Sequence, residues 1–408
     1  MANALPLSIA VAGLGGYAGY IRKALLEREA APNATVALKA ICEPDLETHA
    51  GLAKELRGKG ILIVNDFAEL LRLPIDAVWL PLPIHLHKKY TLQALQAGKA
   101  VMCEKPAAGA IQDLHAMIDA RDASGLPVAI GFQDIYKPST ATLKTAINDG
   151  VIGPIKSAAV SACWPRDSGY YARSQWAGKQ FYDGTWVMDS PASNALAHFL
   201  NLALYLIGDG RRSADIVKVE AELYRANSIE NYDTCAMRYL TENGVSLLVC
   251  FTHACRETRE PILSIIGERG RIDYSAGKEA KIRVPAQTTT ISLRDEGPEA
   301  MIDTFAHLAA DVPDQRAVAT LEIAKSHLIG VNAASEAAAV RQISQGEITR
   351  VEIDDYTHLL TIPGVEDLFD YCAQNHLLPS ETRRAEWAVP AGALSVSNYN
   401  YFNGPKVC

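Results

Sequence analysis

An apolar strand, a glycine-rich turn and a helix open the chain in that order, and this order limits the folds open to it. Leu7–Ala12 is an apolar run, GLGGYAG follows at positions 13–19, and a helix-like stretch comes next. Gly13, Gly15 and Ala18 match the G-x-G-x-x-G/A pattern, in which the first glycine allows a tight turn and the second lets the backbone approach a pyrophosphate at the helix N-terminus. Because the pattern lies between a strand and a helix, it predicts dinucleotide binding.

The alternation of strand and helix continues through the first third of the chain. The further predicted strands are Val36–Cys42, Ile61–Val64, Asp76–Leu82, Ala100–Cys103 and Pro127–Phe132. The predicted helices after the first are residues 45–57, 86–97 and 112–123. Strands that alternate with helices of this length predict an α/β fold with a parallel, doubly wound (Rossmann) sheet. We assign this domain to residues 1–136.

Glu43 follows the second predicted strand. In a fold of this kind an acid at that place accepts hydrogen bonds from ribose hydroxyls. A carboxylate also repels a 2′-phosphate, and the segment Glu43-Pro44-Asp45 contains no base. The sequence therefore favours NAD over NADP.

The pattern changes from about residue 137. Predicted helices cover residues 140–148, 191–206 and 321–343, and predicted strands cover residues 155–161, 215–223, 232–239, 245–252 and 261–266. Glu242-Asn243-Gly244 between two of these strands is a hairpin signal. We assign residues 137–408 to an α+β domain with a large, mostly antiparallel open sheet for substrate binding. An apolar outer face of such a sheet predicts a homo-oligomer, either a dimer or a tetramer.

Composition excludes several other classes of protein. The chain has 408 residues, enough for two domains, and its net charge of -8 argues against nucleic acid or an anionic membrane as the main partner. The eight cysteines form no CxxC pair, which predicts reduced thiols and a cytoplasmic location. The N-terminus lacks the positive region of a signal peptide, and no apolar run is long enough to cross a membrane. His85-x-His87 opens a helix without a third ligand nearby, so we expect no metal site.

One long segment carries a family resemblance. DAVWLPLPIHLHKKYTLQALQAGKAVMCEKPAA at positions 76–108 resembles the signature region of the glucose–fructose oxidoreductase/inositol dehydrogenase (Gfo/Idh/MocA) family. The resemblance continues at IGFQDIYKP (130–138), at WPRDSGYYARSQWAG (164–178) and in the helix that ends with LIG at 206–208. It covers most of the chain and is weakest over the last 40 or so residues.

The resemblance implies roles for individual residues. The lysine of the Glu-Lys-Pro motif, Lys105, would lie beside the nicotinamide and the substrate hydroxyl and exchange a proton there, with a cis peptide bond to Pro106. Glu104 would contact the cofactor's ribose or orient Lys105. The implied cofactor-binding residues are Gly13, Gly15, Gly16, Tyr17, Ala18, Glu43, Leu82, Pro83, His87, Glu104, Lys105, Gln133 and Trp176.

On the substrate side, Asn194 and His198 lie four residues apart on one predicted helix and therefore share a face. The family usually has Asp, three residues and then His at this place, so His198 matches and Asn194 departs from the pattern. His198 could carry the proton of the reacting hydroxyl, whereas an amide can only orient. The expected catalytic residues are Lys105, His198 and Asn194, and the expected substrate-binding residues are Lys105, Arg166, Tyr171, Asp189, Asn194 and His198.

Two kinds of function are compatible with these residues. The first is NAD(P)-dependent oxidation of a secondary alcohol of a sugar, sugar derivative or cyclitol, or the reverse reduction. A variant of it keeps NAD tightly bound and recycles it in each turnover. The second is a non-catalytic sensor of dinucleotide or sugar on the same fold. Intact Lys105 and His198 favour the enzyme, and Asn194 is the one feature that favours the sensor.

Overall fold

The computed structural model describes residues 5–294 and 297–407 of the chain. These residues divide into two compact units. The first comprises the described residues of 1–108, 113–141 and 296–324, and the second those of 109–112, 142–295 and 325–408. The first unit therefore extends beyond the single boundary at 136, because a segment from the last third of the chain packs against it.

A six-stranded parallel sheet forms the core of the first unit. Its strands are β1 (Leu7–Ala12), β2 (Val36–Cys42), β3 (Leu62–Val64), β4 (Ala77–Leu80), β5 (Ala100–Cys103) and β6 (Val128–Ile130). Their order in space is β3-β2-β1-β4-β5-β6. The direction of winding reverses between β1 and β4, which confirms the predicted doubly wound fold and puts its switch point beside the glycine turn.

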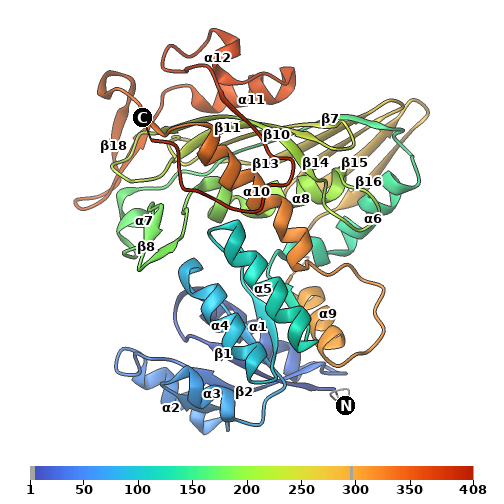
Figure 1. Ribbon diagram of the computed structural model, residues 1–408, viewed down its shortest axis with the longest axis vertical. Helices are drawn as coiled ribbons and strands as arrows, with labels where there is room; N and C mark the ends of the chain where they lie inside the picture. Colours follow the sequence, from blue (N-terminus) through green and yellow to red (C-terminus); the bar gives the residue numbers. More distant parts are fainter. Residues whose placement is uncertain (1–4, 295–296, 408) are drawn as a thin grey trace. The chain divides into compact units, whose positions relative to one another are not determined.

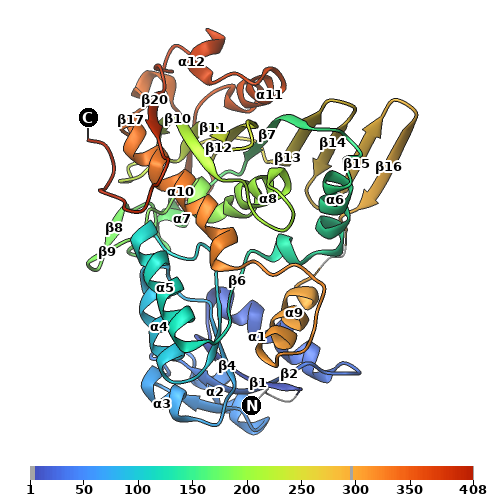
Figure 2. The same ribbon diagram turned by 45° about the vertical axis from the view of Figure 1, so that its right-hand side comes forward.

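Helices cover both faces of this sheet. They are α1 (Gly16–Ala30), α2 (Ala50–Gly58), α3 (Phe67–Arg72), α4 (Ile84–Gln96), α5 (Ile111–Ser124), the short 3₁₀ helix η1 (Gln133–Tyr136) and α9 (Glu299–Ala309). Figure 2 shows α4 and α5 on one side of the strands and α1 and α9 on the other. The sequence analysis did not predict α3 or α9. Helix α9 is held by Asp303, which accepts hydrogen bonds from Arg28 at 2.6 Å and from Thr35 at 2.5 Å.

The second unit is built on a ten-stranded sheet. Its strands are β7 (Ile155–Cys163), β10 (Ile216–Arg225), β11 (Thr234–Thr241), β12 (Ser246–Thr252), β13 (Arg259–Gly267), β14 (Arg271–Ser275), β15 (Glu279–Val284), β16 (Gln287–Ser292), β17 (Arg341–Gln342) and β20 (Gly392–Ser395). The order is β16-β15-β14-β13-β7-β12-β11-β10-β17, and β20 pairs with β10. Among the described strands of this second sheet, only the β7–β12 and β10–β17 pairs are parallel, so the predicted mostly antiparallel sheet is confirmed.

The other elements lie wholly or mostly in the second unit, and of these α6 and α10 begin with residues of the first. They are α6 (Pro138–Asn148), α7 (Ser168–Ala172), β8 (Phe181–Tyr182), β9 (Thr185–Trp186), the π-helical turn η2 (Pro191–Ala195), α8 (Ala197–Ile207), α10 (Leu321–Ala337), the 3₁₀ turn η3 (Gln345–Glu347), β18 (Thr349–Glu352), β19 (His358–Thr361), α11 (Val365–Asn375) and α12 (Pro379–Thr382). The helix predicted over residues 191–206 is thus a π-turn followed by an α-helix. No helix among the described residues has the length and apolar character needed to cross a membrane.

Lys144 of α6 holds the carboxyl end of α8. Its ammonium is buried and donates to the carbonyl oxygens of Tyr205 and Gly208, each at 2.5 Å, and of Leu206 at 3.3 Å. The last carbonyl groups of a helix have no partner within the helix, so this cation supplies what the helix itself cannot. Burial lowers the pKa of Lys144 to about 8. The helix that carries His198 is therefore anchored at its far end.

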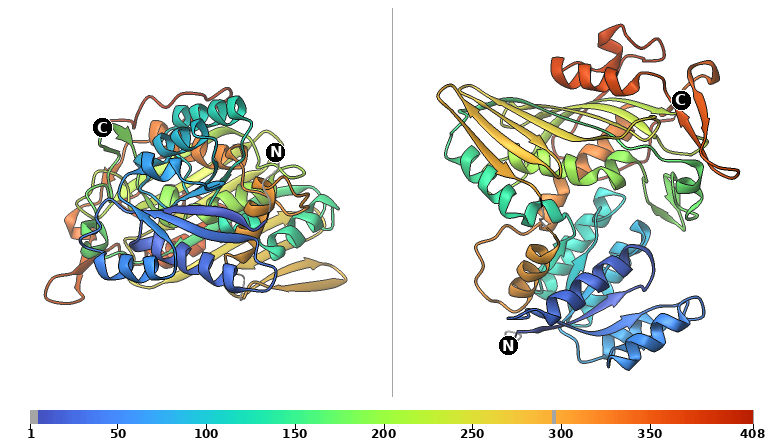
Figure 3. Two further views of the ribbon diagram at one scale, coloured as in Figure 1. Left: turned by 90° about the horizontal axis from the view of Figure 1, so that it is seen from below. Right: turned by 180° about the vertical axis from the view of Figure 1, so that it is seen from behind.

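Residues 343–391 cover the outer face of the large sheet, and we call this segment the C-terminal cover. Its side chains Ile362, Val365, Leu368, Phe369 and Cys372 join one buried cluster with strand residues that include Ala159, Tyr224, Ala236, Leu248 and Cys250. Figures 1 and 3 show α11 and α12 on this face, opposite α6 and α8. Part of the apolar face that the sequence analysis offered for self-association is therefore occupied by the same chain.

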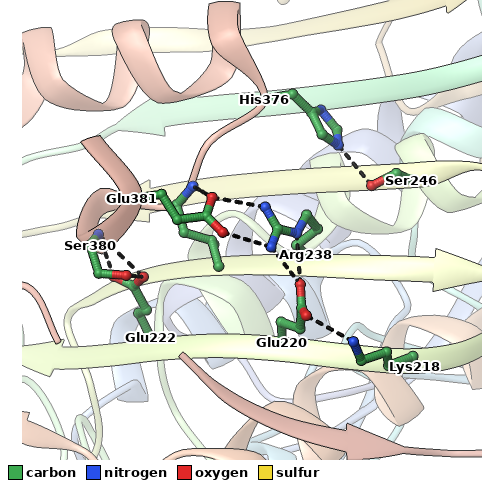
Figure 4. A network of polar contacts seen from close by, with 9 residues as sticks. Lys218, Glu220, Glu222, Arg238, Ser246, His376, Ser380 and Glu381 are labelled. Carbon is green, nitrogen blue, oxygen red and sulfur yellow. Dashed lines mark hydrogen bonds and ion pairs between the residues drawn. The ribbon is translucent and has the colours of Figure 1, made fainter. Parts of the chain in front are cut away.

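Polar contacts fasten the C-terminal cover to β10, β11 and β12 (Figure 4). Arg238 on β11 donates to both carboxylate oxygens of Glu381, at 2.8 and 2.9 Å, and to Glu220 at 2.7 Å. Ser380 donates to Glu222 at 2.6 Å, and Ser246 lies 2.7 Å from the His376 ring. These bonds satisfy strand side chains that flank the apolar cluster.

Candidate active site

The glycine turn after β1 has the geometry of a phosphate cradle. Gly13 has φ of +110°, a conformation that side chains rarely adopt, and a Cβ added there would lie 3.1 Å from that of Ala18. A Cβ on Gly15 would lie 3.2 Å from the His49 ring. Helix α1 starts at Gly16 and has no side-chain cap, so the first N–H groups of the helix can bind a phosphate. Tyr17 is 43% exposed at the start of α1.

Glu43 is in direct contact with this turn. One carboxylate oxygen accepts a hydrogen bond from Leu14 N at 2.8 Å, and the other accepts one from Asp45 N at 3.0 Å. The turn is also tied to β2 by Gly13 N, which donates to Cys42 O at 2.7 Å. Each carboxylate oxygen keeps a further lone pair for a ribose hydroxyl. The residues of this half therefore fit a dinucleotide.

Glu104 and Lys105 follow β5 at the same carboxyl edge of the sheet, and the Lys105–Pro106 peptide bond is cis. The Glu104 side chain is only 4% exposed. Its carboxylate accepts hydrogen bonds from the Trp79 indole at 3.1 Å and from Lys105 N at 3.3 Å. Glu104 thus lies inside the unit against the backbone of Lys105, an arrangement that suits its expected role in orienting this lysine.

Gly131 makes room for Glu104. A Cβ at this position would lie between 2.4 and 2.7 Å from the carboxyl atoms of Glu104, closer than side chains can pack. Gly131 N also donates to Cys103 O at 2.8 Å and so joins the ends of β6 and β5. Neither Trp79 nor Gly131 was expected at the site, because nothing in the local sequence signals their contact with Glu104.

His87 joins the turns that follow β4 and β5. The ring is fully buried, with Nδ1 2.8 Å from Pro106 O and Nε2 2.7 Å from Leu82 O. Two carbonyl acceptors suit a ring with two N–H groups, whereas burial opposes the charged form and lowers the pKa of His87 to about 4. The side chain has no exposed surface, so it can act on a cofactor only through the backbone that it holds. Leu82, Pro83 and Gln133 are partly exposed at this edge.

In the second unit, Asn194 and His198 lie on one side of the segment from η2 to α8. The partly exposed residues of this segment are Asn194, Ala195, His198 and Phe199, and its other residues are buried. The predicted common face of Asn194 and His198 is therefore present, although the backbone changes from a π-turn to an α-helix between them.

Asp189 lies just before this segment and is 2% exposed. One of its carboxylate oxygens accepts from the Asn194 amide at 2.7 Å, and the other accepts from Gly178 N at 2.7 Å. Arg173 is 3.8 Å from the second oxygen. This chain lacks the family's carboxylate at position 194, but the carboxylate of Asp189 lies directly beside Asn194.

Aromatic rings and arginines form the loop next to α8. Trp164 packs edge-on against Phe199 with ring centres 6.0 Å apart, and the guanidinium of Arg166 lies over both Trp164 and Tyr170. Arg173 lies 3.5 Å above the Tyr170 ring and 5.3 Å from that of Trp176. Burial raises the pKa of Tyr171 well above its ordinary value. The Tyr170 and Tyr171 rings pack edge-on with centres 5.3 Å apart, so Arg166, Tyr171 and Trp176 belong to one cluster with Tyr170 and Arg173.

His253 at the end of β12 completes this cluster. Its Nδ1 is 2.8 Å from Trp164 O, and its ring centre is 5.9 Å from that of Tyr170. Burial and the charge of Arg166 lower the pKa of His253 to about 3, so the ring is neutral. The sequence analysis missed His253 because it is distant from the loop in the chain, and the strand pattern alone does not show which loop it meets.

No group of three or more potential metal ligands occurs in the described part of the chain. His87, one member of the His85-x-His87 pair, has both ring nitrogens against backbone carbonyls, which leaves neither for a metal.

The chain is similar to known sugar and cyclitol dehydrogenases. It is 25% identical to D-apiose dehydrogenase of Paraburkholderia graminis over 250 residues, which are 60% of this chain and 62% of the relative. It is 25% identical to inositol 2-dehydrogenase of Klebsiella pneumoniae over 222 residues, 54% of this chain and 61% of the relative. The solved structure of levoglucosan dehydrogenase with NADH matches with a TM-score of 0.66 at 18% identity, over 80% of this chain and 95% of that one.

Two family models also match the chain. Residues 7–132 match the oxidoreductase family with an NAD-binding Rossmann fold, and residues 140–273 match the GFO/IDH/MocA C-terminal domain. Together they cover parts of both units, and the glycine turn and the Glu-Lys-Pro motif lie within the first match. The chain belongs to the GFO/IDH/MocA oxidoreductase family.

Proposed function

We propose that this chain is an NAD(P)-dependent dehydrogenase acting on a secondary alcohol of a sugar, sugar derivative or cyclitol. The observation that carries the proposal is the position of Lys105 after β5, at the sheet edge that also bears the glycine turn. In open α/β sheets ligands bind at this edge, near the switch point. The activities named for the similar dehydrogenases support this substrate class.

The chain's own residues have separate tasks in this reaction. When bound, the nicotinamide supplies the acceptor for the hydride that leaves the carbinol carbon. Lys105 takes the proton of the substrate hydroxyl as the C–O double bond forms, and returns it in the reverse reaction. For His198 and Asn194 we propose hydrogen bonds to hydroxyl groups of the substrate. The aromatic and arginine cluster around Tyr170 binds the rest of the polyol and excludes water.

A sensor without catalysis remains the second candidate, because Asn194 replaces the usual aspartate. The carboxylate of Asp189 beside Asn194 weakens that argument.

The seven described cysteines are free and buried, which supports the reducing cytoplasm as the compartment we propose.

We propose that self-association uses the part of the sheet face that the C-terminal cover leaves exposed. On β13, Ile262 and Ile266 are 48% and 45% exposed. Both pair with β7 residues on the side of Ala159, which belongs to the covered apolar cluster, so they lie on the same outer face. Exposed β-branched residues on a flat sheet face suit an isologous dimer.

Replacement of Lys105 tests the proton path. Lys105→Met should lower kcat by about 10²–10⁴ on a sugar or polyol that the wild type oxidises, with NAD binding retained. Lys105→Arg keeps the charge but cannot release a proton at neutral pH, so it should be equally impaired. Absorbance at 340 nm gives the rates. Near wild-type kcat in Lys105→Met would exclude this role.

The titration of Glu104 should make the free energy of unfolding depend on pH. Burial raises the pKa of Glu104 to about 7, against opposing effects of the Trp79 hydrogen bond and the Lys105 charge. In the unfolded chain this carboxyl ionises near pH 4.3, so the native state loses stability as the pH rises from about 4.3 to about 7, by up to about 4 kcal/mol. The free energy of unfolding of Glu104→Gln minus that of the wild type should therefore increase between pH 5 and 8.

Glu27→Gln is the matched control for Glu104→Gln, because the side chain of Glu27 is 65% exposed. Denaturant unfolding at each pH gives the free energies. A difference that stays constant with pH in Glu104→Gln would contradict the raised pKa.

Cofactor choice tests Glu43. Wild type should bind NAD at least tenfold more tightly than NADP, because the carboxylate would face the 2′ position. Glu43→Gln keeps an acceptor for Leu14 N but removes the charge, so it should reduce this preference roughly tenfold. Fluorescence titration of both cofactors measures the ratio. Equal binding of the two cofactors by the wild type would refute this role of Glu43.

The double variant Ile262→Asp with Ile266→Asp should shift the molar mass measured by light scattering toward that of one chain. Leu62→Asp is the control, since Leu62 is 50% exposed but lies on β3, in the sheet of the first unit. A wild-type mass of one chain at high concentration would reject the proposed self-association.

A further inference from the structure

The Asp189–Asn194 pair has a geometry that sets the direction of the Asn194 amide. The Asp189 backbone is held on both sides, because its N–H donates to Lys179 O at 2.9 Å and its carbonyl accepts from Asn231 at 3.1 Å. Its carboxylate accepts from Gly178 N and from the Asn194 side chain, each at 2.7 Å. All four bonds join residues of the second unit, so the pair is preformed within it.

The side-chain nitrogen of Asn194 donates to Oδ1 of Asp189, so the NH₂ group of Asn194 faces Asp189. The amide oxygen of Asn194 is then turned away from Asp189. Asn194 is one of the partly exposed residues of its segment, on the side that also carries His198. The side chain therefore offers this common side an acceptor, as one oxygen of an aspartate would.

We propose that Asp189 is a positioning residue that holds the Asn194 amide with its oxygen toward a hydroxyl donor of the substrate. The pair thereby divides the work of the family's single aspartate: Asn194 supplies the accepting oxygen, and Asp189 supplies the charge that orients it. This inference rests on the proposed function. It also implies that the substrate presents a hydroxyl group, and not a carbonyl or ether oxygen alone, to Asn194.

Because Gly178 also donates to Asp189, asparagine at position 189 cannot preserve both hydrogen bonds. An asparagine at 189 has one accepting oxygen, but both Gly178 N and the Asn194 amide require an acceptor there. If the oxygen of the new amide serves Gly178 N, its NH₂ group faces Asn194 and forces that amide to turn round. A donor is then offered to the substrate hydroxyl in place of an acceptor.

An exchange of the two residues gives the sharpest test. Asp189→Asn should lower kcat/KM by about 10- to 100-fold, the effect of one charge-assisted hydrogen bond. Asn194→Asp should also be impaired, because it sets two carboxylates at 2.7 Å. The double variant Asp189→Asn with Asn194→Asp restores a donor–acceptor pair and leaves an oxygen toward the substrate, so it should recover to within about threefold of wild type.

Asp167→Asn is the matched control. Asp167 is a carboxylate in the same unit that also accepts a backbone hydrogen bond, from Tyr170 N at 2.8 Å, at the start of α7. It should retain wild-type kcat/KM. Losses that multiply in the Asp189/Asn194 double variant, or wild-type kinetics in Asp189→Asn, would overturn the proposal.

Thermal unfolding of the same four proteins without substrate separates this inference from the proposed function. If the residues are paired as described, each single exchange lowers the midpoint and the double exchange recovers it. A protein that oxidises no sugar or polyol but shows this recovery would refute the proposed function and retain the Asp189–Asn194 orientation. Additive losses of stability would refute the orientation itself.

Discussion

The parallel direction of six strands is the constraint on which the cofactor half of the molecule depends. Parallel strands end at the same edge of a sheet, so the turns after β1, β2, β4, β5 and β6 meet there although they are far apart in the chain. The glycine turn, Glu43, Glu104 and Lys105 therefore lie along the same edge of the sheet. His87 adds a direct link, because its ring lies between the carbonyls of Leu82 and Pro106 on neighbouring turns.

Two buried carboxylates have similar tasks in the two units. Glu104 accepts from the Trp79 indole and from Lys105 N, and Asp189 accepts from Gly178 N and the Asn194 amide. Burial of a carboxylate is costly unless N–H groups satisfy its oxygens. A carboxylate that meets this condition is held in one orientation, and it holds its neighbour in turn. In each case that neighbour is a residue expected to contact the substrate.

The large sheet of the second unit has an apolar face that a later segment of the same chain partly covers. Strand side chains such as Ala159, Leu248 and Cys250 would be exposed to water without the C-terminal cover, which lies beyond the residues that the family models match. The Arg238–Glu381 and Ser380–Glu222 contacts fix the position of the cover beside the apolar cluster. Outside the cover, Ile262 and Ile266 of β13 leave apolar surface exposed on the same face.

Local pattern was enough to predict much of this protein. The bounds of β1, β2 and β5 were predicted to the residue, because short apolar runs between turns and helices leave little freedom. The glycine turn, the Glu-Lys-Pro motif and the succession of a parallel sheet and a mostly antiparallel sheet were also predicted from the sequence. What pattern could not supply was contact between distant segments: α9 with the first unit, Trp79 and Gly131 around Glu104, His253 beside Tyr170, and the C-terminal cover on its sheet. The sequence shows that Asn194 stands where the family usually has aspartate, but only the folded chain shows the carboxylate of Asp189 beside it. Asp189 lies in a loop that hydrogen bonds with Gly178 and Asn231 hold in place.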